Sequence, residues 1–292
     1  MPIKKFIGTG VAIVTPFRAD GTVDFNAMRN HINFLISGGV EYILVLGTTG
    51  ESVTLSKEEK NAIISFAIDT IEKRVPLVVG IGGNNTQAII DTIKDTDFSS
   101  IDAVLSVAPY YNKPTQEGLY EHYRNIASVC SVPMILYNVP GRTSSNISAA
   151  TTVKLAKNVK NIIGIKEASG NFSQIMQIIK NKPKDFMVIS GDDALTLPMI
   201  STGATGVISV VANALPKEFS TMVRLALDFK FDEARKIHYQ LLDFIELLFQ
   251  ENNPGGIKAA LEAKKLVGNN LRLPLTPVSK ELYKKIKDFI TQ

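Results

Sequence analysis

Lys166 stands at the end of an apolar run, where a lysine is costly unless it has a function. Residues 162–165 read Ile-Ile-Gly-Ile, the pattern of a short strand buried on both faces of a parallel sheet. Because burial disfavours the charged ammonium, a lysine there can present a free amine, which attacks carbonyl carbons and forms Schiff bases. The segment alone equally permits a lysine that ends the strand and pairs with Glu167.

Two further groups follow the apolar run at 134–137. Tyr137 and Arg142 place a phenol and a guanidinium within one short segment, Tyr-Asn-Val-Pro-Gly-Arg-Thr at 137–143. Tyrosine can relay protons, and arginine binds a carboxylate through a bidentate fork. Taken singly, Tyr137 is equally interpreted as a core aromatic and Arg142 as a surface charge.

Three turns carry other polar groups. Residues 47–52, Gly-Thr-Thr-Gly-Glu-Ser, combine close backbone approach with hydroxyls and N–H groups that suit a carboxylate. Residues 80–85, Gly-Ile-Gly-Gly-Asn-Asn, suggest a phosphate cradle but lack the lysine of a P-loop. Residues 109–114 add two phenols, Tyr110 and Tyr111.

The composition is that of an ordinary enzyme chain: 292 residues, 45% hydrophobic and 21% charged, with a net charge of +4. The lysines form no nucleic-acid footprint. The single cysteine, Cys130, excludes an internal disulfide and is expected to pack in the core. The three histidines lie far apart, so we expect no metal site. We expect no signal peptide and no membrane span.

Short Val/Ile/Leu-rich runs alternate with longer helical patterns. A capping box, Ser56 with Glu59, opens the second helix. We expect strands at 11–14, 42–46, 77–80, 103–107, 134–137, 162–166, 187–190 and 206–210, and helices at 25–37, 56–73, 86–98, 116–128, 148–157, 172–180, 193–201 and 216–229.

Eight strand–helix units of this length predict an α/β TIM (β/α)8 barrel with parallel strands, and an open doubly wound sheet is the alternative. Three more helices, at about 231–250, 256–267 and 279–290, form a C-terminal extension. We therefore divide the chain into a catalytic barrel, 1–229, and an extension packed on it, 230–292. In such barrels active sites form at the carboxyl ends of the strands, where the groups above gather.

Together these motifs resemble the dihydrodipicolinate synthase/N-acetylneuraminate lyase family of pyruvate-dependent class I aldolases. The resemblance covers essentially the whole chain from Gly10. It is carried by residues 47–51, 137–140 and 164–167 with the following Ser169-Gly170.

The resemblance implies a mechanism without metal or organic cofactor. Lys166 would form the imine with pyruvate, whose carboxylate Thr48 and Thr49 would hold. Gly191 and Ile208 would line the same pocket.

The resemblance also implies how the second substrate is treated. Tyr137 would relay protons, linked through Thr48 to Tyr111, which would reach in from a neighbouring subunit. Arg142 would bind the carboxylate of aspartate semialdehyde. This arginine favours the lysine-biosynthesis branch of the family over the sialic-acid lyases, which lack it.

Lysine-inhibited members of the family carry an allosteric site at the dimer interface. Ser52, Asn84 and Tyr110 match that site, but Lys57 stands for a histidine and Ala88 for the glutamate. Because a lysine ligand is cationic, losing a carboxylate and gaining an ammonium predicts weak or absent feedback inhibition.

Three other readings stay open. The chain could be a family aldolase that acts on a sugar acid or N-acetylneuraminate, a non-catalytic relative, or a phosphate-binding barrel. We expect a cytoplasmic homo-oligomer, either a dimer or a tetramer built as a dimer of dimers, with no nucleic-acid or membrane partner.

Overall fold

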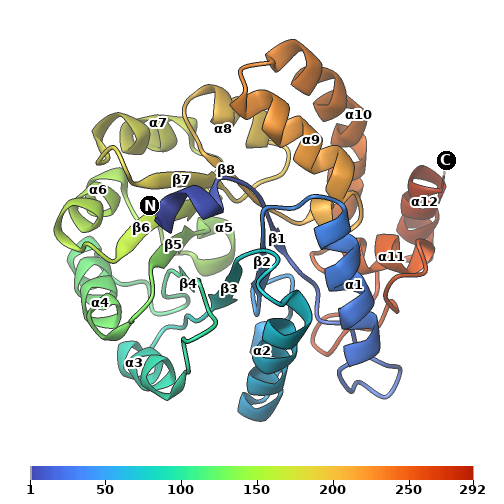
Figure 1. Cartoon of the computed structure of the whole chain (residues 1–292), viewed down its shortest axis with the longest axis horizontal. Coiled ribbons are helices and arrows are strands. Elements are labelled where there is room, and N and C mark those ends of the chain that lie inside the picture. Colours follow the sequence, from blue (N-terminus) through green and yellow to red (C-terminus); the bar gives the residue numbers. More distant parts are fainter. Residues whose placement is uncertain (1, 292) are drawn as a thin grey trace.

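Eight parallel strands close into a barrel in the computed structural model, which describes residues 2–291 (Figure 1). The strands follow one another around the barrel in chain order, and β8 returns to pair with β1 through Gly10 and Ile208. This pairing excludes the open sheet. The strands are β1 (Gly8–Ala12), β2 (Tyr42–Val45), β3 (Leu77–Gly80), β4 (Ala103–Val107), β5 (Met134–Asn138), β6 (Ile162–Glu167), β7 (Met187–Ser190) and β8 (Gly206–Ser209).

Helices ring the strands, and three further helices gather on one side of the barrel, where α10 packs on α9 and α11 and α12 pack on α10 (Figure 1). The ring consists of α1 (Phe25–Ser37), α2 (Lys57–Ile71), α3 (Thr86–Asp95), α4 (Gln116–Val129), α6 (Ala149–Asn158), α7 (Phe172–Asn181), α8 (Thr196–Ser201) and α9 (Pro216–Leu227). The extension consists of α10 (Phe231–Phe249), α11 (Gly255–Ala263) and α12 (Lys280–Ile290). Short elements are η1 (Pro2–Phe6), η2 (Ser52–Thr54), α5 (Pro140–Thr143) and η3 (Val211–Asn213).

Local sequence signals set most helix starts. Asp24, Asn85, Thr115 and Ser148 each accept a backbone N–H bond as N-caps. The predicted capping box at Ser56 is confirmed, with both reciprocal hydrogen bonds present.

The first strand lies earlier than expected, at Gly8–Ala12 and not at 11–14. Gly8 and Gly10 interrupt the β-branched pattern that is typical of strands. A Cβ at Gly10 would lie 2.1 Å from the Tyr42 ring, so glycine lets this large side chain fill the barrel interior. Expected helices 86–98, 193–201 and 256–267 are shorter in the structure, and α5 was not expected.

Two apolar layers make up the core, one inside the barrel and one between strands and helices. The inner layer includes Tyr42, Ile135, Met187 and Ile208. Cys130 is buried, as predicted, and its thiol donates to the Val132 carbonyl. Among residues 2–291, no helix combines the length and the apolar content needed to cross a bilayer.

Asn213 joins the carboxyl ends of β1 and β8. Its amide nitrogen donates to the carbonyls of Ala12 and Val210, so its oxygen must be an acceptor. That oxygen receives the Val14 N–H at 3.3 Å and lies 3.0 Å from His31 Nε2. His31 is therefore neutral with the proton on Nε2, and burial lowers its pKa to about 4.

Candidate active site

Lys166 points into the barrel near the carboxyl end of β6. Its register partners, Tyr137 on β5 and Ile189 on β7, both belong to the inner apolar layer, and paired strand residues share a face. Only 5% of Lys166 is exposed. Its Nζ lies 4.4 Å from the centroid of the Tyr137 ring. The amine and the phenol that the sequence marked separately are therefore neighbours.

Glu167 does not pair with Lys166, so the alternative in which this lysine ends the strand as part of an ion pair is wrong. Successive strand residues face opposite ways, and Glu167 points out toward the helices. Its carboxylate accepts from the Asn138 amide at 3.1 Å, the Gln174 amide at 3.2 Å and the Ser169 N–H at 2.9 Å. Lys166 is left to face the interior without a carboxylate from its own strand.

Gly191 leaves room beside the Lys166 side chain. A Cβ at Gly191 would lie 3.0 Å from Lys166 Cε and 2.8 Å from the Ala168 Cβ. The Gly191 N–H donates to the Glu167 carbonyl at 2.8 Å, which holds the β7 end against β6. Ile208, buried on β8, belongs to the same inner layer as Tyr137.

The turn at 47–52 follows β2 at the same end of the barrel. Consecutive bonds close it, from Gly50 N to the Gly47 carbonyl at 3.1 Å and from Glu51 N to the Thr48 carbonyl at 3.0 Å. Thr48 is exposed and Thr49 is buried. The Thr48 side chain therefore faces solvent, whereas the Thr49 side chain is packed inside the protein.

The C-terminal extension contacts this turn at two residues that sequence reasoning missed. The Asn253 amide donates to Thr49 Oγ1 at 3.1 Å. Lys258, on α11, forms an ion pair with Glu51, and neither side chain is exposed. Lys258 interrupts a segment, 255–261, that is otherwise apolar and buried, which is the same signal that marked Lys166. Burial lowers the pKa of Lys258 to about 8, even beside the Glu51 carboxylate.

Arg142 and Tyr111 lie at the rim. Arg142 is exposed on α5, and the Tyr111 N–H donates to the Thr143 carbonyl at 3.4 Å. The Tyr111 side chain is 88% exposed, on a backbone with φ of 74°. Within residues 4–291, Thr48 is hydrogen-bonded through its side chain neither to the buried Tyr137 nor to the exposed Tyr111.

The residues of the expected allosteric site are spread over neighbouring loops and helices. The Asn84 amide donates to the Tyr110 carbonyl at 3.1 Å. Lys57 forms an ion pair with Asp95 at 2.9 Å. Ala88 lies in the first turn of α3, and Ser52 begins η2 directly after Glu51.

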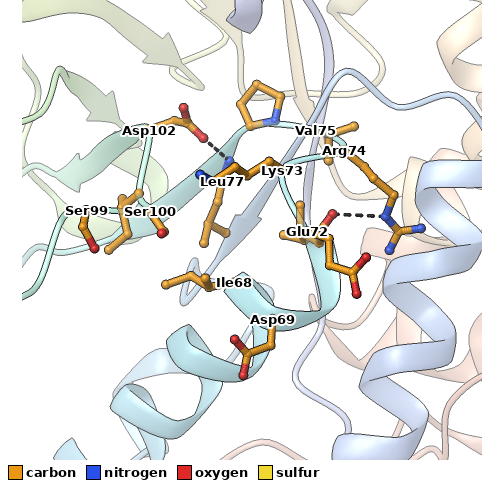
Figure 2. Close-up of a pocket in the computed structure, with 13 residues that line it drawn as sticks. Ile68, Asp69, Glu72, Lys73, Arg74, Val75, Leu77, Ser99, Ser100 and Asp102 are labelled. Carbon is orange, nitrogen blue, oxygen red and sulfur yellow. Dashed lines mark hydrogen bonds between the residues drawn. The ribbon is translucent and has the colours of Figure 1, made fainter.

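A surface cleft of about 610 Å³ lies at the amino ends of β3 and β4, opposite the end that carries Lys166. Figure 2 shows its lining, with Asp102 bonded to the Leu77 N–H and Glu72, Lys73 and Arg74 along its edge.

In the part of the chain that the structure describes, no three His, Cys, Asp or Glu side chains gather as a metal site.

Comparison with known proteins identifies relatives of the chain. A model of the dihydrodipicolinate synthetase family matches residues 5–292. The chain is 52% identical to 4-hydroxy-tetrahydrodipicolinate synthase of Flavobacterium psychrophilum over 290 residues, 99% of each chain.

Solved structures share the fold of the chain. Dihydrodipicolinate synthase from Thermotoga maritima superposes with a TM-score of 0.96, at 36% identity over 98% of each chain. The chloride-inhibited dihydrodipicolinate synthase from Acinetobacter baumannii, complexed with pyruvate, superposes with a TM-score of 0.94, at 39% identity over 98% of each chain.

Proposed function

The chain belongs to the dihydrodipicolinate synthetase family, and we propose that it condenses pyruvate with L-aspartate-4-semialdehyde to give 4-hydroxy-tetrahydrodipicolinate, a lyase-type step of diaminopimelate and lysine biosynthesis. The observation that carries this proposal is the Lys166 amine inside the barrel, 4.4 Å from the Tyr137 ring and beside the space left by Gly191.

The proposed reaction begins when the Lys166 nitrogen attacks the ketone carbon of pyruvate and water leaves, which gives an imine. Loss of a methyl proton then gives an enamine, whose carbon attacks the aldehyde carbon of the second substrate. The Tyr137 phenol passes the protons that these steps release and consume. Finally the amine of the semialdehyde displaces Lys166 as the ring closes, so the lysine is regenerated.

Substrate carboxylates would be held by two separate groups of residues. Thr48, Thr49 and the backbone of their turn would hold the pyruvate carboxylate, in a pocket lined by Gly191 and Ile208. Arg142 would bind the carboxylate of the semialdehyde, because a guanidinium matches its two oxygens. The rim position of Arg142 suits the substrate that arrives second.

A second copy of the chain would complete the site. The exposure of the Tyr111 side chain supports its insertion into a neighbouring subunit, next to Thr48. We propose a homo-oligomer, a dimer or a dimer of dimers, in the cytoplasm, with residues 1–229 as catalytic barrel and 230–292 as extension. The altered residues Lys57 and Ala88 support weak or absent inhibition by lysine.

Mass spectrometry after incubation with pyruvate and borohydride would test the proposal. We expect a reduced pyruvyl adduct on Lys166 in the digested protein, and no adduct in the variant Lys166→Ala. A folded protein that forms no adduct would remove the Schiff-base mechanism. A panel of aldehyde acceptors, with pyruvate constant, then separates aspartate semialdehyde from sugar-acid and N-acetylneuraminate chemistry.

A further inference from the structure

The buried ion pair between Glu51 and Lys258 takes no part in the proposed chemistry. Glu51 ends the turn that carries Thr48 and Thr49, whereas Lys258 belongs to the C-terminal extension, 207 residues later. Both side chains are entirely shielded from solvent. A contact of this kind links the extension directly to the candidate carboxylate-binding turn.

The surroundings of the pair leave neither charge unpartnered. Lys258 Nζ donates to the Glu51 carboxylate and, at 2.7 Å, to the Asn270 carbonyl, and it lies 4.3 Å from the centroid of the Phe17 ring. The other Glu51 oxygen accepts from the backbone N–H of Arg272 at 3.1 Å. The carboxylate is thus held at both oxygens by residues of the extension.

Stability alone does not account for this pair. Removing two charges from water is costly, and apolar side chains of similar volume commonly replace a buried pair without loss of stability. Glu51 also has a left-handed backbone, with φ of 52°, which is unfavourable for a residue other than glycine. A carboxylate anchored at both oxygens would hold that backbone in place.

The hydrogen bonds of the turn show which residues the anchored Glu51 side chain would hold in place. The Glu51 N–H donates to the Thr48 carbonyl, and the Gly50 carbonyl accepts from Thr15 Oγ1 at 2.7 Å. Because the Glu51 N–H closes the turn, release of the Glu51 side chain would loosen this bond and let the Thr48 and Thr49 hydroxyls move. The turn is therefore anchored at its last two residues, by Thr15 at Gly50 and by the buried ion pair at Glu51.

We propose that Lys258 is a positioning residue that, through Glu51, holds the Thr48–Thr49 turn in its pyruvate-binding geometry. This role rests on the proposed function, because it assumes that the turn binds the pyruvate carboxylate. It makes the C-terminal extension part of the active-site framework.

The test compares Lys258→Met alone with the double variant Glu51→Gln/Lys258→Met. The single change leaves a buried carboxylate without its cation and lowers the melting temperature. The double change removes both charges and keeps an oxygen for the Arg272 N–H, so it restores most of the melting temperature. We nevertheless expect the double variant to need roughly tenfold more pyruvate for half-maximal borohydride trapping and for KM, because the turn is displaced.

The variant Glu281→Gln/Lys285→Met is the matched control, since it removes an exposed ion pair of α12 that lies away from the turn. We expect it to keep the wild-type melting temperature and pyruvate KM. If Glu51→Gln/Lys258→Met recovers both melting temperature and pyruvate KM to within about twofold, the pair is only structural and the proposal is wrong.

Two further measurements distinguish a failure of this inference from a failure of the proposed function. Should the Lys258 variants fail to fold, Glu51→Gln alone, which keeps shape and Lys258, must raise the pyruvate KM for the proposal to stand. If the wild-type protein itself forms no Lys166 adduct, the proposed function fails, and this inference with it. If the wild type forms the adduct, the variants test the positioning role alone.

Discussion

Lys166 Nζ lies 4.4 Å from the centroid of the Tyr137 ring, and the two residues are register partners on β6 and β5. The parallel ladder holds them together, because partners on adjacent strands project from the same face. An amine and a phenol are thus fixed side by side without any hydrogen bond between them being needed.

Replacing Tyr137 by phenylalanine keeps the ring over Lys166 but removes the hydroxyl. We expect kcat to fall by roughly 100-fold or more, because proton transfer by the phenol is lost. Steady-state kinetics would measure this, and circular dichroism would confirm that the buried ring still packs. A variant with kcat close to wild type would exclude Tyr137 as the proton relay.

Gly191→Ala would introduce a Cβ where Lys166 and Ala168 already lie within 3.0 Å. We expect the Lys166 side chain to move, with slower pyruvate trapping and a loss of roughly 1–3 kcal/mol in the free energy of unfolding. Gly83→Ala is the control, because its nearest neighbour would lie 3.7 Å away. Equal trapping rates in both variants would contradict a packed wall at Gly191.

The variant Arg142→Ala tests whether this residue binds aspartate semialdehyde and not pyruvate. We expect the KM for aspartate semialdehyde to rise roughly tenfold or more, through loss of a charge-assisted pair, with pyruvate trapping on Lys166 unchanged. Because Arg142 is exposed, stability should change by less than about 0.5 kcal/mol. A rise confined to the pyruvate KM would assign Arg142 to the other carboxylate.

Acid should weaken the fold through His31. Its pKa is about 4 in the folded chain and 6.5 when unfolded, so unfolding takes up a proton between these values. The stabilisation that comes from neutral His31 is therefore complete above pH 6.5. As the pH falls toward 4 it is lost, and the free energy of unfolding decreases by up to about 1.4 kcal/mol per pH unit.

The variant His31→Gln isolates this effect. Asp193, whose pKa burial raises to about 6, changes stability in the opposite direction over part of the range but does so in both proteins. We expect the variant to be less stable at pH 7 and the difference to narrow as the pH falls, measured by denaturant unfolding. A difference that stays constant from pH 7 to pH 4 would contradict the neutral state of His31.

Lysine should inhibit weakly or not at all. Ala88 offers no carboxylate to a lysine ligand, and Lys57, paired with Asp95, adds a like charge nearby. Initial rates measured over a lysine titration would check this. Inhibition at sub-millimolar lysine would show that other residues supply the missing contacts.

Much of the barrel could be predicted because its signals are local. The apolar runs at 77–80, 103–107 and 187–190 coincide with β3, β4 and β7, and α1 spans 25–37 as expected. N-caps such as Ser56 act through neighbouring backbone N–H groups, so they are readable from a few residues. Lys166 could be singled out for the same reason, since its apolar neighbours are adjacent in sequence.

The tertiary structure decided what depends on distant segments. Gly10 belongs to β1 through its pairing with β2 and β8, and the Tyr42 ring leaves no room for a Cβ at this position. Residues 8–12 alone do not reveal either fact. Glu51 and Lys258, or Thr49 and Asn253, meet only after the barrel closes and the extension folds over it. Local apolar patterns determined where most strands and helices lie. The tertiary structure decided which side chains face the barrel interior and which of them touch, because both depend on how whole elements pair and pack.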